Sequence, residues 1–147
     1  MLALAGTAVS FAASPNDEAD CWVRVMRLHG EVGCALQALG VAAAPLGAGA
    51  RSPAARRWRQ RTMGQDAGEL VAGRAFEACR ARGDWLVRTV DVLTGAIEIY
   101  GTALDRALER RGTGRAELME RLRDPRSAAA KPNVAAPVLA SRESRAS

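Results

Sequence analysis

The sequence has very few of the residues on which most catalytic and metal sites depend. Only 4% of its 147 residues are aromatic, and His29 is the only histidine. Any imidazole-based acid–base or zinc scheme would have to use that one residue, which has no carboxylate three or four positions away to orient it. A Gly-rich phosphate loop of the GxxxxGKS/T kind is also missing. We therefore expect a non-enzymatic protein with no catalytic residue, no metal site and no cofactor.

Cysteine is equally sparse. Cys21, Cys34 and Cys79 are odd in number, far apart, and without CxxC or Cys/His spacing, which excludes a regular disulfide framework and a zinc site. Reduced thiols, as in the cytoplasm, are the natural interpretation. Arg80 and Arg82 beside Cys79 could lower the pKa of its thiol, but a thiol near arginines is far more often inert than catalytic.

Long apolar runs are absent as well. Residues 1–13 are apolar but lack a preceding Lys or Arg, so we expect a flexible leader, with a cleaved secretory signal as the alternative. The longest uncharged run, Val32–Ala50, has the length of a membrane span but contains Gln37 and Pro45. We expect no transmembrane span.

Positive charge is present in excess, almost all of it from arginine. The formal net charge is +5, and Lys131 is the only lysine among 21 basic residues. One cluster combines arginines with a stacking residue, which suits contact with an anion or non-specific contact with nucleic acid. It consists of Arg56, Arg57, Trp58, Arg59 and Arg61. The alternative is a solvated, Arg-rich first turn of a helix.

Helix punctuation and 3.6-residue periodicity predict an all-α protein, because no segment has the alternating pattern of a strand. Ser14-Pro15 and Ser52-Pro53 are helix-start signals, and Gly112 can end a helix. We expect a helical domain over 14–123, arranged as an antiparallel three-helix bundle, and a disordered tail over 124–147. Its helices are predicted over 15–40, 53–80 and 84–111, with a short fourth helix over 115–123.

The predicted helix over 84–111 carries the strongest apolar pattern. Its main seam recurs at spacings of four and three residues and comprises Leu86, Val90, Leu93, Ile97, Tyr100, Leu104 and Ala107. A second stripe, Trp85, Val92 and Ile99, recurs every seven residues beside the seam. One stripe is enough for an intramolecular core, so the second predicts either a wider core or contact with a protomer or an apolar interface.

The segment from Glu77 to Ala107 resembles the phasins, small helical proteins that coat polyhydroxyalkanoate granules. The shared features are "ACR", then a break at "GD", a mixed apolar run, an "E-x-Y" and a helix continuing through "TALDRALE". Upstream, "RTMGQDAGELVAGRAFEACRA" is similar to the helix that precedes this region in such proteins. The resemblance covers roughly Arg61 to Arg110, a third of the chain.

The resemblance implies a protein without an active site that adsorbs to hydrophobic polyester at the surface of cytoplasmic storage granules. Apolar helix faces would lie against the polymer and charged faces toward water. The implied interaction face is Trp85, Leu86, Val90, Val92, Leu93, Ile97, Ile99, Tyr100 and Leu104. The implied water-facing side is Arg88, Asp91, Glu98, Asp105, Arg106 and Glu109.

Two other functions fit the same sequence. A helical protein–protein adaptor would use the seam to bind partner helices, and a homo-oligomer could form through it. A basic, nucleic-acid-associated protein would use the arginine cluster around Trp58.

Overall fold

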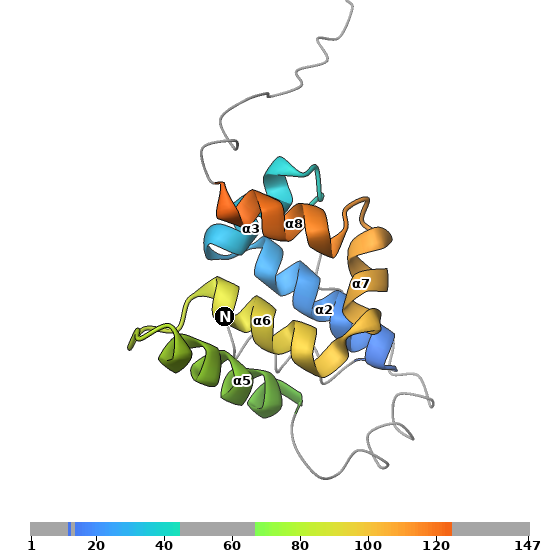
Figure 1. Cartoon of the computed structure of the whole chain (residues 1–147). Helices are drawn as coiled ribbons and strands as arrows, with labels where there is room; N and C mark the ends of the chain where they lie inside the picture. The colour runs from blue at the N-terminus through green and yellow to red at the C-terminus, as the bar shows by residue number, and fades with distance from the viewer. Residues whose placement is uncertain (1–11, 13, 45–66, 125–147) are drawn as a thin grey trace, which may run out of the picture.

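The computed structural model describes residues 12, 14–44 and 67–124, and these residues form six α-helices and no strand (Figure 1). The predicted all-α class is therefore confirmed. The structure does not confirm a three-helix bundle, because two of the three long helices predicted from the sequence are each divided in two. In the described part of the chain no helix is both long and apolar enough to cross a membrane.

The first helix, α2 (Pro15–Arg27), starts where the sequence predicts. The Ser14 hydroxyl accepts a hydrogen bond from the backbone N–H of Asp17 at 3.2 Å, and Pro15 occupies the first helical position. This cap satisfies a backbone donor that the helix itself leaves unpaired.

The predicted helix over 15–40 breaks at Leu28 and His29, and the chain continues as α3 (Gly30–Ala38). His29 has extended backbone angles and Gly30 has a φ of +57°, a conformation that side chains disfavour. A Cβ atom on Gly30 would also lie 2.6 Å from the side chain of Thr89. The corner therefore requires a glycine. It ends α2 at a point where apolar spacing alone predicts one continuous helix.

Helix α5 (Ala67–Ala81) lies against α6 (Thr89–Tyr100). A Cβ atom on Gly95 would lie 2.7 Å from the carbonyl oxygen of Val71 and 3.1 Å from the amide nitrogen of Ala75. The absence of a side chain at Gly95 thus lets the two helix backbones approach closely. The first part of the predicted helix over 53–80, residues 53–66, lies outside the described residues.

The predicted helix over 84–111 is also divided. Its first part is α6, which begins five residues later than predicted, and its second part is α7 (Thr102–Glu109). Gly101, with a φ of +48°, separates the two. The apolar spacing continues across this break, which is why the pattern predicts one helix. The last helix, α8 (Arg115–Arg123), occupies the predicted range, and of the predicted tail only Asp124 is described.

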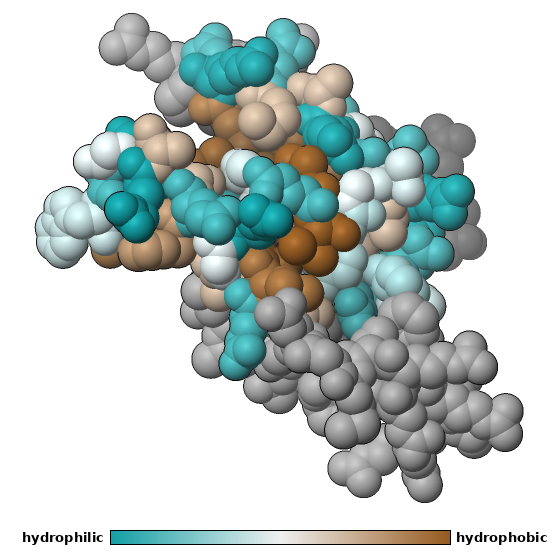
Figure 2. Space-filling view, turned by 60° about the horizontal axis from the view of Figure 1, so that its bottom comes forward, coloured by the Kyte–Doolittle hydropathy of each residue, from teal (hydrophilic) through white to brown (hydrophobic). Residues whose placement is uncertain are grey.

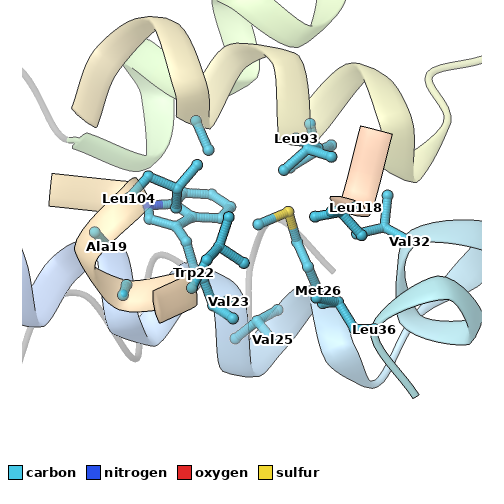
Figure 3. Close-up of a cluster of buried hydrophobic side chains, with 14 of the residues drawn as sticks. Ala19, Trp22, Val23, Val25, Met26, Val32, Leu36, Leu93, Leu104 and Leu118 are labelled. Atoms are coloured by element: carbon cyan, nitrogen blue, oxygen red, sulfur yellow. The ribbon is translucent and has the colours of Figure 1, made fainter. Parts of the chain in front are cut away.

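Helix α2 lies at the centre of the molecule and packs against α3, α6 and α7, while α5 covers the outer side of α6 and α8 packs on α3 (Figure 1). Its central place agrees with a buried surface that includes Trp22, Val23 and Met26. Figure 3 shows Met26 pointing toward Leu93 and Leu118, which belong to α6 and α8. One apolar core therefore joins the first and last described helices.

Candidate interaction surface

Most of the predicted interaction face belongs to this core. Val92, Leu93 and Leu104 are no more than 1% exposed. Four others are half-buried and pack against the core: Val90, Ile97, Ile99 and Tyr100. The face predicted to lie against an external surface is thus mainly an internal packing surface in the folded chain.

The second stripe also has an internal partner. Val92 and Ile99 lie on the same side of α6 as Gly95, three residues after the first and four before the second. Gly95 is the point where α5 crosses α6 at close range. Val92 and Ile99 therefore face the side of α6 on which α5 packs, and for these two residues the structure supports the wider core.

Trp85 and Leu86 are the two exposed residues of the predicted interaction face, with exposed fractions of 91% and 64%. They lie between α5 and α6, where the sequence predicts the first turn of the long helix and the structure has a loop. Large apolar side chains left in water at this level are costly, and in a rigid segment they mark a contact surface.

The loop that carries them is held by hydrogen bonds on both sides. The Arg82 guanidinium pairs with the Asp91 carboxylate through both ends, and its Nε donates to the Asp84 carboxylate at 2.9 Å. The Cys79 thiol donates to the carbonyl oxygen of Asp84 at 3.4 Å. Trp85 and Leu86 therefore extend from a fixed support, which reduces the conformational entropy lost on binding.

Asp91 is the centre of this support, although the phasin resemblance places it on the water-facing side. Its side chain is only 2% exposed, and its carboxylate also accepts the backbone N–H of Arg88 at 2.7 Å, which fixes the start of α6. Burial raises the pKa of the Asp91 carboxyl, but the bonds from Arg82 and Arg88 outweigh burial and hold the pKa below its usual range. The same pairing raises the pKa of Arg82.

The loop lies next to the corner between α2 and α3. Arg88 forms an ion pair with Glu31, and Thr89 touches Gly30. Leu28, two residues before Gly30 in that corner, is 53% exposed. We call Leu28, Trp85 and Leu86 the loop surface. In Figure 2 the loop between α5 and α6 lies at the left edge, where apolar and weakly polar residues border hydrophilic ones.

The residues considered for catalysis do not come together. His29 stands at the helix break instead of within a helix seam, and its Nε2 is buried without a hydrogen-bond partner in the described residues. Cys79 is buried, Cys34 is exposed, and burial raises the pKa of the Cys21 thiol. Within residues 14–44 and 67–124 no three His, Cys, Asp or Glu side chains form a potential metal site.

The arginine cluster of Arg56, Arg57, Trp58, Arg59 and Arg61 lies outside the described residues. Neither the bonds from Asp91 to Arg82 and Arg88 nor the exposure of Leu28 was predicted from the sequence. The role of Asp91 had a recognisable signal, because an acidic residue three positions after the N-cap residue, here Arg88, is a common capping arrangement.

No protein-family model matches the chain, and no curated protein or solved structure matches it either. The resemblance to phasins therefore rests on the residues quoted above.

Proposed function

We propose that the protein is a non-enzymatic, phasin-like coat that adsorbs to polyhydroxyalkanoate storage granules in the cytoplasm. The observation that supports this best is the exposure of Trp85 and Leu86 on a loop held by Arg82 and Asp91. The loop surface makes the contact, in place of the whole helix face implied by the resemblance.

The energetics of such a contact are favourable but modest. Burying the exposed parts of Trp85 and Leu86 contributes roughly 5 kcal/mol in apolar transfer, before the loss of translational and rotational freedom is subtracted. A single copy would bind reversibly. Many copies on one particle would still form a coat, and the charged surfaces of the remaining helices would face water and keep coated particles apart.

The test is co-sedimentation of the purified full-length chain with polyhydroxybutyrate particles over a range of salt concentrations. Apolar adsorption predicts binding that saturates and survives high salt. The double variant Trp85→Ser, Leu86→Ser should lose most of the binding while keeping its helical circular dichroism, because both side chains are exposed. Substituting Leu93 would be uninformative here, since this residue is 1% exposed and its loss would damage the core.

Phe76→Ser is the matched control. Phe76 is also a large, exposed apolar residue, at 53%, but it lies within α5 and not in the loop. It should bind particles like the unchanged chain. Equal losses in both variants would refute the loop as the contact. No binding of the unchanged chain above that of an inert globular protein would overturn the coat function and favour a protein–protein adaptor.

A further inference from the structure

The loop surface is bordered by charged side chains of both signs, among them three arginines. Between residues 80 and 88 the chain has three arginines and one aspartate, at Arg80, Arg82, Arg88 and Asp84. The arginines flank Trp85 and Leu86 in the sequence on both sides. A surface that carries an indole ring, an aliphatic side chain and nearby cations is typical of proteins that bind at the boundary between anionic headgroups and acyl chains.

The three arginines differ in how far they are neutralised. Arg82 is paired with Asp84 and Asp91, and Arg88 with Glu31. The side chains of Arg82 and Arg88 are still 33% and 50% exposed, so part of each side chain faces water. A guanidinium has five N–H donors, more than these pairs use, and the remainder suit phosphate oxygens.

Arg80 is the most available of the three. It is exposed in the last turn of α5, and its guanidinium lies 6.0 Å from the centre of the Phe76 ring. Among the described residues it has no acidic partner. Its charge can therefore be neutralised by an external anion without breaking a pair inside the protein.

From this arrangement we propose that the loop surface recognises an anionic lipid interface. Trp85 and Leu86 enter the boundary between headgroups and acyl chains, while Arg80 and the exposed edges of Arg82 and Arg88 contact lipid phosphates. This inference rests on the proposed function, because it names the interface that the same surface enters. A nucleic acid is a poorer match, since it offers phosphates but no apolar layer for Leu28 and Leu86.

The experiment is flotation of the full-length chain with vesicles of phosphatidylcholine, with or without phosphatidylglycerol. The expected result is binding that requires phosphatidylglycerol, weakens as salt is added, and is lost in Trp85→Ser. Arg80→Gln should weaken binding about fivefold, the effect of one cation at an anionic surface. The matched control is Arg106→Gln, which removes an exposed arginine of α7 and should leave binding unchanged.

Three outcomes would overturn the inference. The first is equal binding to both kinds of vesicle, and the second is an equal loss of binding in Arg106→Gln and Arg80→Gln. The third is vesicle binding that is displaced by double-stranded DNA and that Trp85→Ser leaves unchanged. The last would assign the arginines to nucleic acid. Polyester binding without a preference for phosphatidylglycerol would refute this inference alone and leave the coat function standing. Failure to bind either polyester or vesicles would refute both.

Discussion

Trp22 and Tyr100 are 78 residues apart in the sequence and joined in the structure by one hydrogen bond. The indole Nε1 of Trp22 donates to the Tyr100 hydroxyl oxygen at 3.1 Å. Trp22 has no exposed surface, so its N–H would otherwise lie in an apolar core without this acceptor. The bond ties the middle of α2 to the end of α6 and fixes where the two helices cross.

Tyr100→Phe should lower the free energy of unfolding by about 1–3 kcal/mol, because it leaves a buried donor without its partner. Urea denaturation followed by circular dichroism measures the change. A double-mutant cycle with Trp22→Phe separates the hydrogen bond from the loss of indole packing. Independent effects of the two substitutions would show that the bond contributes nothing.

Two glycine-to-alanine substitutions should have opposite signs. Gly95→Ala places a Cβ atom against backbone atoms of α5, and we expect a loss of about 1–3 kcal/mol despite the better helix propensity of alanine. Gly73→Ala, on α5, meets no atom within 4 Å and should gain about 0.5–1 kcal/mol. Thermal and urea unfolding of both variants provide the test. A stabilised Gly95→Ala variant would refute the close contact between α5 and α6.

Asp91→Asn tests the support of the loop. The substitution keeps the size of the side chain but removes its charge, and we expect a loss of about 1–3 kcal/mol at neutral pH. The folded chain lowers the pKa of Asp91, so the charge contributes its full stability above the unfolded-state pKa of about 4 and loses it as pH falls through the folded-state pKa.

The difference in stability between the unchanged chain and Asp91→Asn should therefore shrink below pH ~4. Unfolding curves collected between neutral and acidic pH measure it. Glu120→Gln, at an exposed position of α8, is the control and should show little difference at any pH. If the difference in stability between the unchanged chain and Asp91→Asn stays constant down to low pH, the charge of Asp91 is not stabilised by folding.

The three thiols should react in a fixed order. Cys34 is exposed and should be labelled first by a disulfide reagent, followed by the half-buried Cys21, whose raised pKa leaves less thiolate at neutral pH. Cys79 has no exposed surface and should react only as the chain opens. Mass spectrometry of timed samples gives the order, and Cys34→Ser should remove the fastest phase. Early labelling of Cys79 would contradict its burial.

How far the fold could be predicted depended on which signals are local. The start of α2 at Ser14-Pro15 and the end of α8 before Asp124-Pro125 were recognised because caps and helix-stopping prolines act within a few residues. The breaks at Gly30 and Gly101 were missed, because each has a positive φ that a glycine permits without revealing it in the sequence. At Gly30 the deciding contact is with Thr89, 59 positions away, which no local pattern contains.

The candidate surface was predicted only in part for a related reason. Periodicity identified Leu93 and Leu104 as apolar face residues, but it could not say that α2 packs against the two helices that carry them. The exposure of Trp85 follows from the later start of α6, which Asp91 sets by binding the N–H of Arg88. The spacing of apolar residues does not predict that the carboxylate of Asp91 is buried.

The central position of α2 has a consequence for synthesis on the ribosome. This helix is made before the other described helices, yet its ion pair from Asp20 to Arg111 and its core contact with Leu118 involve residues made about 90 positions later. Until those residues leave the exit tunnel, Trp22 and Met26 have no complete cover, and the apolar face of α2 stays accessible to chaperones. Because the chain must close long loops before such distant contacts can form, we expect folding to finish only after α8 is released.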